Sequence, residues 1–178
     1  MDLAQRKNVR LAGYDYSSAG GYFVTICTAS RRRLFANPAV VEETIAVLRE
    51  RSTALCFLVY AFCFMPDHLH LVLIAQQEAS DLVRFVREFK GAAAARLRPL
   101  GVRNLWQKSY YDHVLRSGEA LDSVAWYIFN NPLRAGLVRN IGEWPFSGSW
   151  MFDWNKVVAP TRPFEPPWKK TKAGRSVL

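Results

Sequence analysis

Two apolar runs separated by a short turn constrain the fold of this chain more than any other feature. The first run, CFLVYAFCF at 56–64, is apolar at every position, and the second, HLHLVLIA at 68–75, follows directly after Met65-Pro66-Asp67. A run without polar alternation indicates a strand buried on both faces, and so short a connection joins antiparallel neighbours. The pair therefore predicts an antiparallel hairpin inside a sheet.

Residue patterns on either side of the hairpin predict one strand and two helices. Residues 22–29 are rich in β-branched and aromatic side chains, which is typical of a strand. Apolar positions recur at helical spacing from residue 38 to about residue 51, and we expect this helix to pack on the sheet. A second amphipathic helix runs to about residue 97, and Ser80 can cap its start.

The region after this second helix predicts an extended segment and one further helix. Aromatic and β-branched residues dominate 105–116, which favours an edge strand. Ser117 then offers an N-cap for a helix that contains Tyr127 and that Pro132 should end or kink. This order of elements predicts an α+β fold in which helices pack on one antiparallel sheet.

Length and charge bound the organisation and the partners of the chain. With 178 residues, half of them hydrophobic, we expect one domain over 1–154 and a basic tail rich in Pro and Lys over 155–178. Lys and Arg number 24 against 15 acidic residues, and this excess favours nucleic acid as a partner, although a well-solvated basic surface explains it equally well. Three cysteines within apolar runs and the lack of a bilayer-length apolar stretch favour a cytoplasmic protein.

His68 and His70 alternate with leucines on the second strand of the hairpin. Alternate side chains share a face of a strand, so both imidazoles can converge on one metal ion while Leu69 and Leu71 point into the core. Two histidines make an open site, in which a substrate phosphate can supply further ligands. Two polar residues on the exposed face of a strand would give the same pattern, so the pair by itself leaves both interpretations open.

Tyr127 and Asn131 are four residues apart and therefore share one side of the predicted helix. The Asn131 amide oxygen can serve as a third metal ligand. An aromatic residue at a helix–sheet boundary and an asparagine before a proline would give the same pattern without any site. Tyr110 and Tyr111 lie just upstream, so a different tyrosine can also face the metal.

Three segments in this order resemble the REP-associated tyrosine transposases, a branch of the IS200-like, single-tyrosine HUH transposases. They are GGYFVTICT, FMPDHLHLVL and VAWYIFNNPLRAGLV. The similarity extends from about Arg10 to Trp150, and WPFSGSW is likewise similar to a family segment. MPDHLHL resembles the HUH motif of the family, and YIFNNP resembles the segment with the nucleophilic tyrosine. The resemblance implies a ferredoxin- or RRM-like antiparallel sheet with the nucleophile on a C-terminal helix.

The resemblance also implies a role for each matching residue. It implies that His68, His70 and Asn131 bind Mg²⁺ or Mn²⁺ and that Tyr127 is the nucleophile. The implied reaction cleaves single-stranded DNA beside a hairpin, such as a REP-like palindrome, and leaves the DNA joined through its 5′ phosphate to tyrosine. Attack by a 3′-OH then rejoins the strands without a high-energy cofactor. We expect a monomer rather than a homodimer.

Several basic residues are candidates for contacts with DNA phosphates, although for any single one a solvated charge is the simpler interpretation. They are Arg31, Arg32, Arg33, Arg84, Arg87 and Lys90, and in the tail Lys169, Lys170 and Lys172. Two other classes of function stay open. One is a non-catalytic protein derived from a transposase that binds hairpins or single-stranded DNA and needs no metal. The other is a metal phosphoesterase that activates water and forms no protein–DNA adduct.

Overall fold

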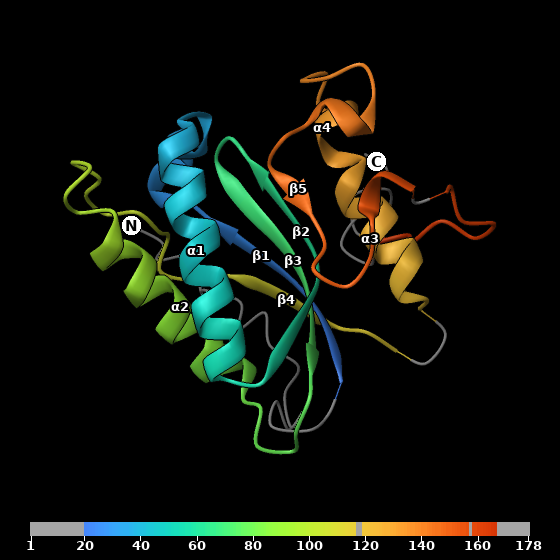
Figure 1. The fold of residues 1–178 in the computed structure, drawn as a ribbon, viewed down its shortest axis with the longest axis horizontal. Coiled ribbons are helices and arrows are strands. Elements are labelled where there is room, and N and C mark those ends of the chain that lie inside the picture. Colours follow the sequence, from blue (N-terminus) through green and yellow to red (C-terminus); the bar gives the residue numbers. More distant parts are fainter. Residues whose placement is uncertain (1–19, 117–118, 157, 167–178) are drawn as a thin grey trace, which may run out of the picture.

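The structure is a computed structural model that describes residues 20–116, 119–156 and 158–166. The centre of this described part is a five-stranded antiparallel sheet (Figure 1). Its strands are β1 Gly21–Cys27, β2 Phe57–Met65, β3 His68–Ala75, β4 Tyr111–Val114 and β5 Ser147–Gly148. Their order across the sheet is β4-β1-β3-β2-β5. The predicted hairpin of β2 and β3 is confirmed, and it occupies the middle of the sheet.

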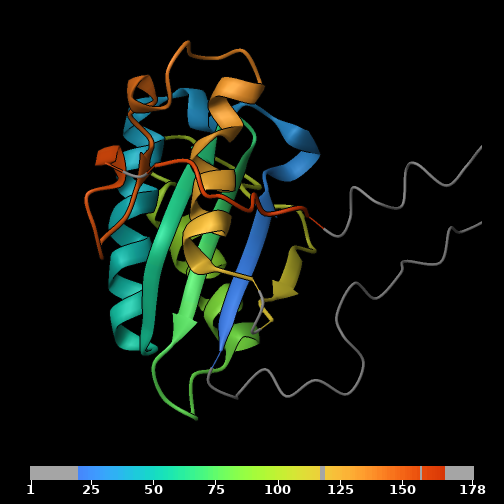
Figure 2. The same cartoon turned by 90° about the vertical axis from the view of Figure 1, so that its right-hand side faces the viewer.

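Helices cover both faces of this sheet. Two long helices, α1 Pro38–Ala54 and α2 Leu82–Arg96, pack on one face (Figure 1). The helix α3 Leu121–Phe129 and the short helix α4 Asn131–Arg134 lie against the other face (Figure 2). Short 3₁₀ turns lie at Ala29–Arg31, Leu34–Ala36, Ile141–Glu143 and Trp154–Lys156. The predicted α+β fold is confirmed. Among the described helices, none combines the length and the apolar composition needed to cross a bilayer.

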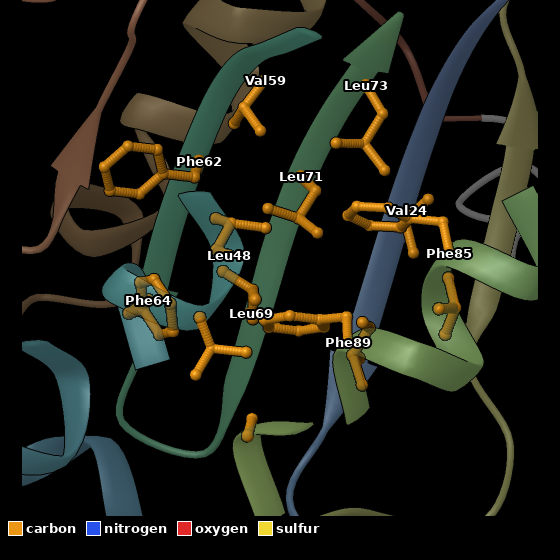
Figure 3. Packing of buried hydrophobic residues seen from close by; sticks show 14 of the residues in the cluster. Val24, Leu48, Val59, Phe62, Phe64, Leu69, Leu71, Leu73, Phe85 and Phe89 are labelled. Atoms are coloured by element: carbon orange, nitrogen blue, oxygen red, sulfur yellow. The ribbon is translucent and has the colours of Figure 1, made fainter. Parts of the chain in front are cut away.

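Alternation along β3 decides which side chains face the larger core. Leu69, Leu71 and Leu73 are fully buried and pack with two phenylalanines of α2 and with residues of α1 (Figure 3). Each such side chain contributes about 1.5–3 kcal/mol when it leaves water. A slip of β3 by one residue would place polar residues in this core, so the packing fixes the register of the strand. His68 and His70 consequently project from the opposite face.

Two helix starts differ from the sequence prediction. Asp81, not Ser80, caps α2, because its Oδ1 accepts hydrogen bonds from the backbone N–H groups two and three residues later. A carboxylate at this place also interacts favourably with the positive end of the helix dipole. The Ser80 hydroxyl instead donates to a backbone carbonyl just before β2. The helix α3 follows Ala120 rather than Ser117, and Ser117 itself lies outside the described residues.

The region predicted to be extended over 105–116 forms less strand than expected. The strand β4 is only four residues long, and upstream of it Trp106 makes an isolated bridge. Between Trp106 and β4, Lys90 donates to the backbone carbonyls of Gln107 and Lys108, and just before this region Arg32 donates to those of Arg103 and Asn104. These carbonyls therefore find donors without a strand partner.

Candidate active site

The two histidines of β3 come together at the end of the strand next to the turn. In the ladder with β1, His70 pairs with Thr25 and His68 pairs with Cys27. Directly paired residues of antiparallel strands point to the same face, so the four side chains share one side of the sheet. The Nε2 atoms of His68 and His70 are 3.0 Å apart. The structure thus brings the two imidazoles together, as the alternation along the strand predicts.

Each imidazole is oriented by a partner on its other ring nitrogen. Asp67 Oδ1 accepts a hydrogen bond from His68 Nδ1 at 2.6 Å, and His70 Nδ1 lies 2.8 Å from Thr25 Oγ1. Asp67 is held in turn by Arg31, whose guanidinium lies 3.3 Å from Asp67 Oδ2. Partners of this kind fix the tautomer and the direction of metal-binding histidines. The two Nε2 atoms are therefore left to face one common point.

Asp67 and Thr25 were not identified as site residues from the sequence. Asp67 reads there as a turn residue, although an acidic side chain directly before an H-x-H pair is a usable signal. Thr25 gives no such signal, because its place opposite His70 depends on the register between two strands that are far apart in the chain.

Burial keeps both histidines neutral. It lowers the pKa of His70 well below the usual 6.5, and the electrostatic interactions with His68 and Arg134 act in the same direction. Burial also lowers the pKa of His68, although the hydrogen bond with Asp67 opposes this change. For Asp67, burial alone would raise the pKa, but the contacts with His68 and Arg31 outweigh it and lower the pKa. Two neutral imidazoles beside a carboxylate are the protonation states that bind a metal ion.

The geometry of the histidine pair fits a divalent cation. Octahedral ligands placed about 2.1 Å from one ion lie about 3.0 Å from their neighbours, and the two Nε2 atoms are separated by 3.0 Å. Within the described ranges, no group of three or more His, Cys, Asp and Glu side chains gathers around a common point. Further ligands would therefore be an amide oxygen, water or a substrate phosphate, a set that suits Mg²⁺ or Mn²⁺.

The histidine pair opens into a pocket of about 460 Å³. Its lining residues are Thr25, Cys27, Arg31, His68, His70, Gln107, Ser109, Tyr110 and Tyr111. Tyr111 pairs with Thr25 in the ladder between β4 and β1, so Tyr111, Thr25 and His70 form one row across the sheet. Burial raises the pKa of Tyr111 to about 12, and the nearby carboxylates of Asp112 and Glu119 contribute. Tyr111 is therefore close to the histidines but difficult to ionise.

Tyr127 lies on the same side of the sheet as the histidine pair but lines a different pocket. Its side chain projects from α3, which crosses this face of the sheet (Figure 2), and is only 8% exposed. The Phe23 ring contacts both Tyr127 and His70, with ring centroids 6.2 Å and 5.5 Å away. Phe164 packs on Tyr127 at 5.5 Å, and both line a second pocket of about 210 Å³ with Arg134. Phe23 thus links the tyrosine pocket to the histidine pocket.

Pro132 was expected to end or kink the helix that contains Tyr127, and the break lies at Asn130, so Asn131 begins a second helix rather than sharing one helix with Tyr127. The helix α3 ends at Phe129 and α4 begins at Asn131, because the ring of Pro132 would collide with a carbonyl of the preceding turn. Asn131 Oδ1 accepts a hydrogen bond from Arg134 Nη2. Its Nδ2 is buried and has no hydrogen-bond partner among the described residues.

The predicted DNA-contacting residues occupy different settings. Arg31 lines the histidine pocket, whereas Arg32 and Lys90 use their charged groups to hold backbone carbonyls. Burial lowers the pKa of Lys90. Arg84 pairs with a glutamate of its own helix at 2.8 Å.

The other predicted contacts are exposed or fall outside the described part of the chain. Arg33 and Arg87 are exposed, and the tail lysines Lys169, Lys170 and Lys172 lie beyond the described residues. A contact with DNA stays a prediction for every member of this set.

The fold and the histidine face define a class of protein, and the comparisons with known proteins agree with it. The chain belongs to the family described as "Transposase IS200 like", which matches residues 17–131. Within that class it is similar to the REP-associated tyrosine transposase of Escherichia coli (strain K12), with 26% identity over 135 residues that cover 74% of this chain and 78% of the relative.

A solved structure of a REP-associated tyrosine transposase bound to a REP hairpin shares the fold. It aligns with a TM-score of 0.66 at 21% identity and covers 88% of this chain and 99% of the other chain. The family resemblance read from the three sequence segments is therefore confirmed.

Proposed function

We propose that this chain is a metal-dependent endonuclease and strand transferase that cleaves single-stranded DNA beside hairpins through a 5′-phosphotyrosine intermediate. One observation carries the proposal: two histidine Nε2 atoms face each other at 3.0 Å while Asp67 and Thr25 anchor their Nδ1 atoms. Membership in the IS200-like transposase family supports DNA as the substrate class.

In this proposal each side chain has a defined task. His68, His70 and Asn131 hold Mg²⁺ or Mn²⁺, which supplies positive charge that stabilises the charge developing on the scissile phosphate. Tyr127 loses its phenolic proton as its oxygen bonds to phosphorus. The bond from phosphorus to the 3′ oxygen breaks, and that oxygen leaves and takes up a proton. A 3′-OH that attacks the phosphotyrosine reverses these steps and rejoins the DNA.

We take Tyr127 rather than Tyr111 as the nucleophile. Tyr111 lines the histidine pocket, but burial and neighbouring carboxylates raise its pKa to about 12, which opposes formation of a phenolate. Tyr127 instead carries the Arg134 guanidinium over its ring, with Cζ 4.1 Å from the ring centroid. A guanidinium stacked at this distance fixes the orientation of the Tyr127 ring.

The partner and the assembly belong to the same proposal. A relative of similar fold has been solved with a REP hairpin, and we infer that a hairpin of REP-like palindromic DNA is also the ligand of this chain. His68, His70 and Tyr127 project toward the same face of one sheet within one chain, so a monomer can supply the whole site. A cytoplasmic location, where the chain would meet DNA, completes the proposal.

The test incubates the protein with a labelled library of single-stranded hairpins and Mn²⁺ and resolves the products on a denaturing gel. We expect a protein–DNA adduct whose modified peptide contains Tyr127. The variant Tyr127→Phe should lose the adduct and all cleavage while it keeps hairpin binding. The matched variant Tyr111→Phe should keep the adduct.

Other results of this experiment identify the alternatives. An adduct that persists in Tyr127→Phe and disappears in Tyr111→Phe would move the nucleophile to Tyr111. Cleavage without an adduct would indicate a phosphoesterase that activates water. Hairpin binding without cleavage would indicate a non-catalytic recognition module.

A further inference from the structure

We propose that Arg134 is a positioning residue that holds the Tyr127 ring and the Asn131 amide with a single guanidinium. The proposal rests on the proposed function, because it takes Tyr127 as the nucleophile and Asn131 as a metal ligand. Arg134 closes the short helix α4, three residues after Asn131 and seven after Tyr127. Arg134 lies within the segment VAWYIFNNPLRAGLV that carries the family resemblance, but the resemblance gave it no role.

Two contacts define the position of the guanidinium. Its Cζ lies 4.1 Å from the centroid of the Tyr127 ring, and its Nη2 donates to Asn131 Oδ1. A guanidinium is planar and carries five donors in a rigid fork, so it can stack on a ring while its edge forms hydrogen bonds. A lysine ammonium is a point charge on a flexible stem and cannot make both contacts with the same geometry.

For Asn131, the contact selects which amide atom is presented as a ligand. The carbonyl oxygen has two lone pairs, of which Arg134 uses one, and the other stays available to a metal ion. Rotation of the amide by half a turn would set its NH₂ group against the guanidinium and lose a charge-assisted hydrogen bond. Arg134 thus orients the Asn131 oxygen in the way that Asp67 orients His68.

For Tyr127, the contact with Arg134 supplies a restraint on the ring that a continuous helix would otherwise provide. Because Pro132 separates α3 from α4, a single uninterrupted helix does not fix the distance between the tyrosine and Asn131. Arg134 spans this break and restrains both side chains together. Its charge also attracts the negative charge that the phenol oxygen takes up during attack.

The diagnostic variant is Arg134→Lys, because it keeps the charge and removes the fork. Arg134→Ala removes both, and Arg139→Ala is the matched control, since it removes an exposed arginine from the loop that follows α4. For each full-length protein we would measure the single-turnover rate of adduct formation at saturating hairpin, the hairpin Kd, and the Mn²⁺ affinity without DNA by calorimetry.

We expect the adduct rate to fall about 10-fold in Arg134→Lys and about 30-fold in Arg134→Ala, as the loss of one cation–π contact and one charged hydrogen bond predicts. Mn²⁺ affinity without DNA should fall about 10-fold in both variants, as for other residues that orient a ligand. The hairpin Kd should stay within about two-fold of wild type, as for a residue whose charge is not needed for phosphate contact. Arg139→Ala should match wild type in all three measurements.

The proposal would be overturned if Arg134→Lys kept both the wild-type rate of adduct formation and the wild-type Mn²⁺ affinity. It would also be overturned if only the hairpin Kd changed, because Arg134 would then be a phosphate contact. If wild-type protein forms no adduct, the proposed function fails, and the Mn²⁺ measurement still decides whether Arg134 orients Asn131. Circular dichroism melting identifies a variant that does not fold, and if Arg134→Ala is one, Arg134→Lys decides alone.

Discussion

At the scale of single residues, Asp67 has the most direct influence on the proposed metal site. Its two carboxylate oxygens have different partners. Oδ1 accepts a hydrogen bond from the His68 imidazole at 2.6 Å, and Oδ2 lies 3.3 Å from the Arg31 guanidinium. The same turn residue therefore orients a proposed metal ligand and places a cation at the wall of the histidine pocket. A carboxylate on Nδ1 also makes the opposite ring nitrogen a stronger donor to metal.

The substitution Asp67→Asn should weaken Mn²⁺ binding about 10-fold, since loss of such an outer partner commonly costs 10- to 100-fold in metal affinity. Asparagine keeps an acceptor for His68 Nδ1 but loses the negative charge. Calorimetric titration of the DNA-free protein with Mn²⁺ measures the change. Glu42→Gln, an exposed carboxylate on α1, is the control and should bind Mn²⁺ as wild type does. Equal affinity in Asp67→Asn would mean that His68 keeps its direction without this carboxylate.

At the scale of elements, replacing each of two glycines by alanine should change the free energy of unfolding in opposite directions. A Cβ at Gly148 in β5 would lie 2.5 Å from Cζ of Phe62, which is buried and packs against Trp150. A Cβ at Gly91 within α2 would meet nothing within 4 Å. Gly148→Ala should therefore lower the free energy of unfolding by about 1–3 kcal/mol through overpacking. Gly91→Ala should raise it by about 0.5–1 kcal/mol, because alanine loses less backbone entropy in a helix.

Urea unfolding at fixed pH measures both changes, and each variant controls for the other because the added group is the same methyl. A stabilised Gly148→Ala protein would show that the Phe62 ring moves aside without cost. In that case β5 would be held more loosely than its two paired residues suggest.

The elements that could be predicted from the sequence are those whose pattern is local. The alternation of histidine and leucine in β3 fixes both the buried side and the histidine side of one strand, and the structure has the hairpin that the short turn predicts. The break at Pro132 could also be predicted, because a proline ring excludes a continuous helix. Its effect on Asn131 could not, since that depends on how α4 turns back toward Tyr127.

Features that depend on long-range pairing could not be predicted from the sequence. The contact between Thr25 and His70 joins residues 45 positions apart and follows from the register of β1 on β3. The cap of α2 was misplaced by one residue because serine and aspartate are equally good N-caps and only the backbone geometry chooses Asp81.

At the scale of the whole molecule, the two faces of the sheet carry cations in different settings. On the face covered by α1 and α2, Arg96 pairs with Glu43 at 3.3 Å and with Glu50 at 2.9 Å. On the histidine face, Arg31 lines the pocket and is more than half exposed. Among the described residues, Arg96 has two carboxylate partners, whereas Arg31 has only Asp67 and lines an open pocket, so Arg31 should gain more from a DNA phosphate. The hairpin should therefore bind at the histidine face.

Salt dependence of hairpin binding tests this placement. Each phosphate contact contributes about 0.7–0.9 to the slope of log Kd against log salt concentration. Measured in EDTA, so that metal binding does not contribute, Arg31→Ala should reduce the slope by about this amount. Arg96→Ala removes the same charge from the opposite face and should leave the slope unchanged. If Arg96→Ala reduced the slope while Arg31→Ala did not, the DNA would lie across α1 and α2, and the histidine pair could not reach the phosphate that the proposed reaction requires.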